Sequence, residues 1–197
     1  MKMKKVLFIS SRPIYPAVYG ARIRAAQQLE FLTQRYQVDV VYQCEKKIED
    51  VTIAYLPQVN AVKCFRVSRW ICMLQALRFL YNRLPLQVNY YYNKKMYNYI
   101  RQHIGNYDMV FCNNIRTAEY VRTIEGPQKV IDFVDAISMN YEKAKDVAHG
   151  LKRLIYSIDF LRCVNYEQEI LKEFDCCATI SESDKKYILK WQKKSMS

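Results

Sequence analysis

KVLFISSRPIYPAVYGARIRAAQQLEFLTQRYQVDVVY, residues 5–42, is the stretch that decides the fold class. Its first six residues are mostly apolar, which is typical of a strand buried on both faces of a parallel sheet. Pro13, Pro16 and Gly20 then exclude regular structure, and residues 21–36 carry apolar side chains at helical spacing. Because a second apolar strand follows at 38–42, the stretch predicts a strand, helix, strand unit.

The same alternation continues outward from this unit. Further elements are expected as strands at 61–67, 108–112, 130–134 and 176–180, and as helices around 48–56 and at 70–81, 90–104, 115–124 and 183–191. Residues 139–174 form one long helix or two helices that break near Gly150. Repeated strands and helices joined by short loops predict an α/β fold. We expect one Rossmann-like domain over residues 1–197, with a doubly wound parallel sheet.

Composition excludes several function classes. Hydrophobic residues make up 51% of the chain and charged residues 25%, as in ordinary soluble globular proteins. No two of the four glycines lie within six residues of each other, which excludes both the P-loop and the GxGxxG fingerprint. The seven cysteines include no CxxC pair and the two histidines lack metal-ligand spacing. We therefore expect no metal site, no disulfide framework and a reducing, cytoplasmic location.

The charge balance points to an anionic partner. Lysine and arginine number 31 against 19 acidic residues, a formal net charge of +12. Such a charge suits nucleic acid, an anionic membrane surface or a phosphorylated ligand. The sign of the charge does not choose among them.

Candidate site residues are those that follow the strands, because ligands of open parallel sheets lie beyond the carboxyl ends of the strands. Arg22 and Arg24 stand at the start of the first helix, where two cations oppose the helix dipole and indicate a nearby anion. Solvated surface arginines are the alternative. Asp132 lies in an apolar strand and Asp135 follows it, so each has either a functional role or a capping or salt-bridge role. The tyrosines of 90–99 are expected to pack their helix, with a stacking platform for bases or sugars as the alternative.

Several segments taken together carry a family resemblance. They are the opening unit and, in order, RLPLQVNYYYNKKM, YDMVFCNNIRTAEYV, VIDFVDAISMNYEKA, NYEQEIL and FDCCATISESDKKYI. In order and spacing they resemble the amino-terminal, acceptor-binding domain of glycosyltransferase family 4 (group 1), the GT-B sugar transferases of bacterial polysaccharide biosynthesis. The resemblance covers nearly the whole chain.

The resemblance implies one half of a retaining, metal-independent glycosyltransferase that uses no cofactor. Such an enzyme moves a sugar from a nucleoside diphosphate sugar to a saccharide or lipid-linked acceptor, and works from the cytoplasmic side, as a peripheral protein at the inner membrane face. The carboxyl-terminal donor-binding domain of that family is absent from residues 1–197, so the isolated domain is expected to be an inactive hexosyltransferase half.

Catalytic residues stay unassigned, while a set of substrate-binding residues is expected from the strand-end positions and the matched motifs. The set is Gly20, Arg22, Arg24, Asn113, Asn114, Asp135, Ser138, Ser181 and Glu182. Two other functions remain open. The chain could be a basic α/β module that binds nucleic acid, although it lacks a recognition motif, or a catalytically inactive scaffold subunit.

Overall fold

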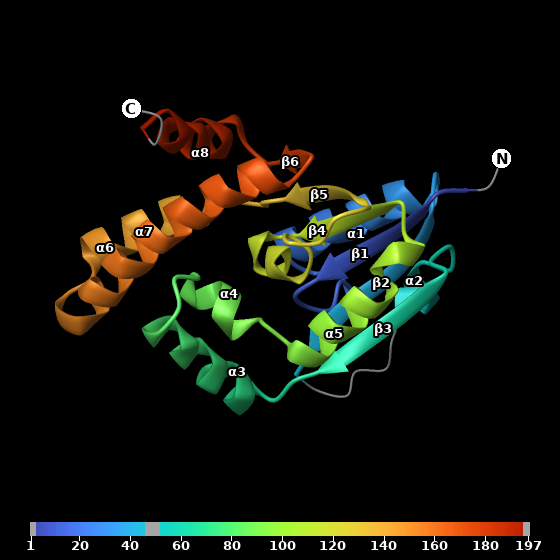
Figure 1. Ribbon diagram of the computed structural model, residues 1–197, viewed down its shortest axis with the longest axis horizontal. Coiled ribbons are helices and arrows are strands. Elements are labelled where there is room, and N and C mark those ends of the chain that lie inside the picture. The colour runs from blue at the N-terminus through green and yellow to red at the C-terminus, as the bar shows by residue number, and fades with distance from the viewer. Residues whose placement is uncertain (1–2, 46–51, 195–197) are drawn as a thin grey trace.

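The structure, a computed structural model, describes residues 3–45 and 52–194 and contains a six-stranded sheet whose paired strands are all parallel (Figure 1). The strand order is β3-β2-β1-β4-β5-β6. The strands are β1 (Lys5–Ser10), β2 (Gln37–Cys44), β3 (Ala61–Arg66), β4 (Met109–Asn113), β5 (Gln128–Asp132) and β6 (Cys176–Ala178). This order is that of a doubly wound, Rossmann-like α/β fold, which confirms the predicted fold class.

Helices connect the strands. The α-helices are α1 (Gly20–Thr33), α2 (Thr52–Tyr55), α3 (Arg69–Ala76), α4 (Leu86–Tyr90), α5 (Lys94–His103), α6 (Ile137–Val147), α7 (Gly150–Glu173) and α8 (Glu182–Lys194). Three short 3₁₀ helices are η1 (Leu77–Leu80), η2 (Ile104–Asn106) and η3 (Ile115–Tyr120). Figure 1 shows α6 and α7 as a long hairpin that extends away from the sheet.

Two hydrophobic cores lie on the two faces of the sheet. Successive side chains of a strand point to opposite faces, and β1 supplies both cores. Val6 and Phe8 pack in the core that contains α1, whereas Leu7 and Ile9 pack in the core that contains residues of α5, η3 and α7. The near-continuous burial of β1 follows from this double covering.

The chain reverses its direction across the sheet between β1 and β4. Ser10 at the end of β1 is in register with Asn113 at the end of β4 and with Tyr42 of β2. A crevice forms outside the carboxyl ends of the strands at such a switch point and is the usual ligand site of these folds. A ligand site is therefore expected at the loops after β1 and β4.

The predicted helix at 90–104 is wrong as one element, because the chain breaks between α4 and α5. Asn93 caps α5, and its side-chain oxygen accepts hydrogen bonds from the backbone N–H groups of Lys95 and Met96. The break is fixed by the buried Tyr120, whose hydroxyl accepts from the Asn93 N–H at 2.9 Å and donates to the Tyr91 carbonyl at 2.8 Å. The periodicity of the tyrosines gave no sign of this contact.

Three other predicted helices have different outcomes. Residues 115–124 contain only the 3₁₀ helix η3, which ends at Tyr120. The region 139–174 forms two helices, as one of the two alternatives had it, and α7 begins at Gly150, where φ is +58°. Of the expected helix around 48–56, residues 52–55 form α2 and the part before them lies outside the described residues.

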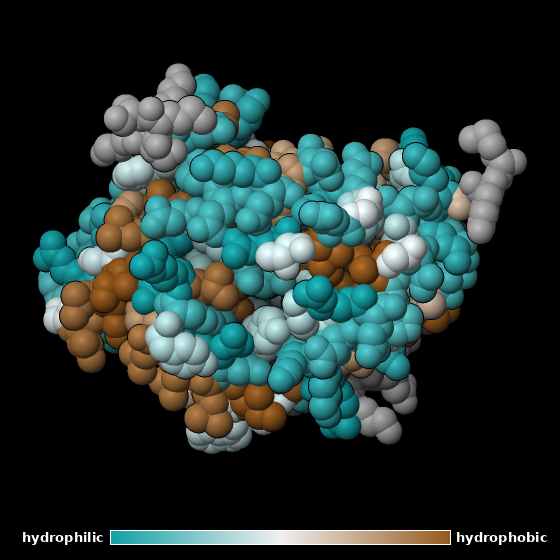
Figure 2. Space-filling model, viewed as in Figure 1, coloured by the Kyte–Doolittle hydropathy of each residue, from teal (hydrophilic) through white to brown (hydrophobic). Residues whose placement is uncertain are grey.

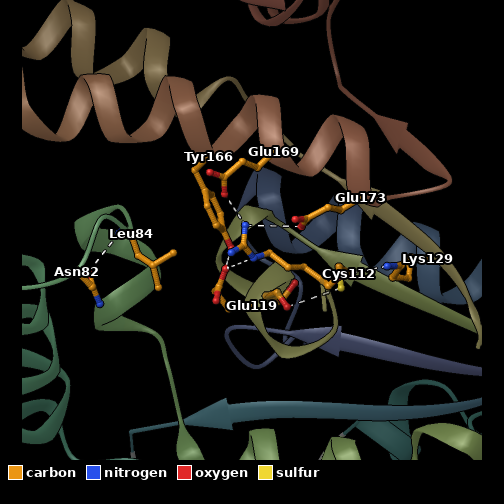
Figure 3. A network of polar contacts seen from close by, with 10 residues as sticks. Asn82, Leu84, Cys112, Glu119, Lys129, Tyr166, Glu169 and Glu173 are labelled. Carbon is orange, nitrogen blue, oxygen red and sulfur yellow. Dashed lines mark hydrogen bonds and ion pairs between the residues drawn. The ribbon is translucent and has the colours of Figure 1, made fainter. Parts of the chain in front are cut away.

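A group of charged side chains holds α7 against η3 (Figure 3). Arg122 forms ion pairs with Glu119 at 2.8 Å and with Glu169 and Glu173 of α7. The Tyr166 hydroxyl donates to Glu119 at 2.9 Å. These ion pairs join α7 to the segment after β4, so we interpret the cluster as structural.

We predict that Tyr120→Phe destabilises the protein. The ring and its packing are retained, but the buried Asn93 N–H loses its partner, which costs about 1–3 kcal/mol. The Tyr91 carbonyl loses one donor and keeps the Gln43 side chain, which donates to it at 2.6 Å. Tyr92→Phe is the matched control, because its ring stacks on Tyr120 while its hydroxyl makes no hydrogen bond in the described part of the chain. Urea unfolding followed by circular dichroism measures both changes, and equal stabilities of the two variants would contradict this account of the break.

Candidate functional site

Two arginines from different strand-end loops converge on one tyrosine at the switch point. Arg12 follows β1 and Arg116 follows β4. The Nε of Arg12 donates to the Tyr91 hydroxyl at 2.9 Å, and the Arg12 guanidinium lies 5.1 Å from the ring centroid. The Arg116 guanidinium lies 4.7 Å from the same ring. We call Arg12 and Arg116 the cationic pair.

The cationic pair has no carboxylate partner within 4 Å among the described residues. The Nε of Arg116 donates to the neutral Gln87 side chain at 2.9 Å. Burial lowers the pKa of Arg116, and the charge of Arg12 lowers it further. Arginine nevertheless stays protonated in proteins. Both guanidinium groups thus lie beside one tyrosine ring, where a bound anion would relieve their repulsion.

A cavity of about 410 Å³ opens beside the cationic pair at the ends of β1 and β2. Arg12, Arg22 and Arg69 line it together with the single carboxylate Glu45, so cations outnumber anions around it. Its lining also includes the rings of Tyr90 and Tyr91. Cations with aromatic rings fit a ligand that carries both an anionic group and a flat or ring-shaped part.

Arg24 is not available to a ligand as the cationic pair is, because it binds the fully buried Asp132. The Arg24 Nε and Nη2 atoms donate to the two oxygens of that carboxylate, at 2.6 and 3.1 Å. Gln28 donates to the same carboxylate and accepts from the Asn113 side chain at 3.3 Å. The anion indicated by Arg24 is therefore a side chain of the protein itself, and the hydrogen bonds to Asp132 raise the pKa of Arg24.

Both non-glycine residues with positive φ in the described chain lie at the carboxyl edge. Asn114 has φ +78° and its side chain accepts from the Arg116 N–H at 3.2 Å, so it sets the position of the arginine. Val134 has φ +66°, and the Asp135 N–H donates to the Phe133 carbonyl across it in a three-residue turn. Such a conformation is strained for a β-branched residue. Residues with strained backbone conformations are more frequent at functional sites than elsewhere.

Two carboxylates hold the start of α6 next to this turn. Glu167 of α7 accepts from the Ser138 N–H at 3.0 Å and from the Ser138 hydroxyl. Asp184 of α8 accepts from the Ala136 N–H at 3.1 Å and contacts the Ser181 hydroxyl. Burial raises the pKa of Glu167 to about 7. Both carboxylates act on the backbone, so Ser138 and Ser181 are engaged in structure.

The remaining predicted residues lie at the carboxyl edge in different surroundings. Asp135 accepts from the Asn140 side chain at 2.8 Å, and its charge acts on Arg116. Gly20 begins α1 without positive φ, and a Cβ there would meet no atom within 4 Å. Arg22 is near the Pro16 carbonyl, and Glu182 is exposed beside Lys185. Of the nine predicted residues, the described contacts join Arg24 and Asn113 through Gln28, and Arg22 lines the cavity.

Sequence reasoning missed the cationic pair and Tyr91. Arg116 comes three residues after the end of β4, and Arg12 lies in the proline-containing loop after β1, so strand-end position was the available signal. Tyr91 stood among the tyrosines expected to pack. Packing is confirmed for Tyr92 and Tyr99, which contact Tyr120 and Phe65 respectively.

Across 3–45 and 52–194, no group of three or more His, Cys, Asp and Glu side chains could hold a metal ion. All seven cysteines are free thiols. In those same ranges, no helix combines the length and the apolar character needed to cross a bilayer.

No protein-family model matches the chain, and no curated protein matches it in sequence. Function must therefore be argued from the residues of the site.

We predict that Arg24→Ala lowers the free energy of unfolding by about 3–5 kcal/mol, because it leaves Asp132 charged, buried and without its cation. Arg22→Ala, two residues earlier in the same helix, removes a side chain whose guanidinium group is exposed. It should change the free energy of unfolding by less than about 0.5 kcal/mol. Urea titration at neutral pH compares them. If both variants unfold at the same urea concentration, the buried pair does not have the stabilising role given to it here.

We also predict a pH dependence from Glu167. Its pKa rises from 4.5 to about 7 on folding, so between these values the unfolded chain ionises while the folded protein keeps the proton. Stability therefore falls as pH rises through this window. Glu167→Gln removes the effect, and its stability relative to wild type should improve by up to about 3 kcal/mol between pH 4.5 and 7. Comparing the two proteins cancels the contributions of Glu119 and Asp159, whose pKa values burial also raises. A constant difference across the window would refute the prediction.

Proposed function

We propose that this chain is the acceptor-binding half of a retaining glycosyltransferase that transfers a sugar from a nucleoside diphosphate sugar to a saccharide or lipid-linked acceptor. The observation that carries the proposal is the cationic pair, which stands at the switch point of a Rossmann-like sheet with no carboxylate partner among the described residues. A phosphorylated ligand supplies the missing negative charge.

The adjoining cavity supports a ligand that is more than a phosphate. Its rings, Tyr90 and Tyr91, offer flat apolar faces beside the guanidinium groups. A sugar ring packs its C–H faces on such aromatic surfaces, while its hydroxyls remain free to reach polar groups. A volume of about 410 Å³ is in the range of small-molecule sites.

In this proposal the residues of the chain bind and orient the ligand. Arg12 and Arg116 hold a phosphate or diphosphate, and Tyr91 keeps the Arg12 guanidinium in place through its hydroxyl. Asn114 and Gln87 fix Arg116 through its backbone and its Nε respectively. Fixed positive charge stabilises a departing diphosphate without reorganisation. The nucleotide sugar itself would be bound mainly by a second, donor-binding domain.

The direct test is binding of inorganic pyrophosphate and UDP by isothermal titration calorimetry. We predict that Arg116→Ala and Arg12→Ala each weaken binding by about tenfold or more, the loss of roughly 1.4 kcal/mol. Arg35→Ala is the control, because Arg35 follows α1 and precedes β2 and so lies at the opposite edge of the sheet. Circular dichroism verifies that each variant is folded.

A second assay addresses transfer. Radiolabelled nucleoside diphosphate sugars are incubated with saccharide and lipid-linked acceptors and with protein expressed from its complete reading frame, with and without the same substitutions. Transfer that falls with Arg116→Ala and not with Arg35→Ala supports the proposal. Binding of duplex or single-stranded DNA in preference to pyrophosphate and UDP, with no transfer from any donor, would instead favour the nucleic-acid module.

A further inference from the structure

An exposed apolar segment follows β3. Helix α3 buries Cys72 alone, although most of its residues are apolar. Trp70 is 75% exposed, and Leu80 and Tyr81 beyond it are 77% and 76% exposed. Leu74 and Leu77 are exposed as well. Scattered apolar residues on a surface are ordinary, but a run of this density marks an interaction site.

A second apolar stripe lies on the outer part of the α6–α7 hairpin. Leu151, Leu154, Ile158 and Leu161 recur every three or four residues, so they share one face of α7, and all four are exposed. Exposed Val147 ends α6 beside them. Figure 2 shows apolar side chains gathered over the region where Figure 1 draws α3 and the end of this hairpin.

The two apolar parts are held together as one body. Arg162 of α7 donates to the Phe79 carbonyl at 2.7 Å, and its guanidinium lies 4.0 Å from the Phe79 ring. The Leu86 N–H donates to Asp159 of α7 at 2.8 Å. Ile158 and Leu161 also line a hollow of about 800 Å³ shared with Leu84. The two apolar parts therefore keep a fixed position relative to each other.

Charge around the apolar residues is positive. Residues 51–107 contain eight lysines and arginines and no aspartate or glutamate. Arg66 and Arg83 are exposed before and after the α3–η1 segment, and Arg69 is exposed at the start of α3. Lys152 and Arg153 are exposed between Leu151 and Leu154. Apolar side chains interleaved with cations are the pattern of helices that lie in the interface of an anionic membrane.

This pattern selects a bilayer over other partners. Leucine and isoleucine side chains bury apolar surface when they contact acyl chains. Nucleic acid binds through the basic groups and would leave most of these apolar side chains exposed. A second copy of the chain would bring the same arginines and lysines face to face, which is unfavourable. Tryptophan and tyrosine at the edges of the apolar run suit the headgroup region.

We propose that the surface formed by 70–81 and 147–161 binds an anionic lipid bilayer, with its apolar side chains at the boundary of headgroups and acyl chains and its cations at lipid phosphates. We call this the membrane-facing surface. Binding of the bilayer does not depend on glycosyl transfer. Arg69 and Cys72 of α3 line the carboxyl-edge cavity while their neighbours are exposed. A route from the membrane to this cavity for a lipid-linked acceptor rests on the proposed function.

Fluorescence of Trp70 tests the contact directly. The chain has two tryptophans, and Trp191→Phe leaves Trp70 as the reporter. With vesicles of phosphatidylcholine containing about 30% phosphatidylglycerol, we expect a blue shift of Trp70 emission and quenching by acyl-brominated lipids. An unchanged Trp70 spectrum while the protein co-sediments with vesicles would overturn the proposal, because binding would then use another surface.

Co-sedimentation of the complete chain measures the two parts of the interaction. At low salt we expect binding to the anionic vesicles to be at least tenfold tighter than to pure phosphatidylcholine. Leu74→Gln with Leu77→Gln should weaken it at least fivefold, whereas Phe31→Gln, an exposed apolar residue of α1, should not. Lys152→Gln with Arg153→Gln should weaken it at least threefold, whereas Lys185→Gln with Lys186→Gln on α8 should not.

Three results would reject the membrane-facing surface. They are equal affinity for neutral and anionic vesicles, loss of a duplex DNA complex in the Leu74 and Leu77 variant, and a dimer in analytical ultracentrifugation that this variant abolishes. Because no nucleotide sugar is present in these measurements, their failure would leave the calorimetric test of the cationic pair unaffected. Thermal unfolding of each variant verifies that the exposed substitutions leave the fold intact.

Discussion

The buried pair of Arg24 and Asp132 is the interaction on which the carboxyl edge depends. It links α1, which follows the first strand, to the end of β5 on the other side of the switch point. A carboxylate without exposure to water needs a cation and hydrogen bonds, and Asp132 obtains them from Arg24, Gln28 and the Val134 N–H. The last of these bonds stabilises the strained turn at Val134, from which the chain enters α6.

From this turn onward, acidic side chains of the last two helices bind the backbone. Glu167 and Asp184 accept from the N–H groups at the start of α6, where free donors would otherwise be buried. These two acidic groups are thus engaged in structure. Arg12 and Arg116 are left on the β1 and β4 side with no carboxylate partner in the described residues, and the chemistry of the edge is concentrated there. The same body carries the apolar run of α3, so the cavity and the membrane-facing surface are neighbours.

Sequence patterns predicted the strands better than the helices. Each predicted strand is present in the structure, because apolar runs buried on both faces leave little freedom in their position. The prediction of one tyrosine-rich helix at 90–104 was wrong because the hydroxyl of Tyr120, which is distant in sequence, hydrogen-bonds to the Asn93 N–H and favours a break there. At the candidate site, strand-end position placed the predicted residues at the carboxyl edge, but it could not tell that Arg24 has an internal partner more than one hundred residues away.

The sequence by itself determined the α/β class, the parallel sheet and the edge at which polar loops meet, since these follow from local periodicity and from the position of each loop after its strand. It also determined the positive charge that any partner must accommodate. The tertiary structure alone decided which charges are free. A guanidinium is neutralised or left available by contacts such as that of Arg24 with Asp132, and such pairings across long sequence separations leave no periodic signal. The exposure of Trp70 and Leu80 was likewise decided by packing, because an apolar helical repeat has the same form whether it is covered or faces outward.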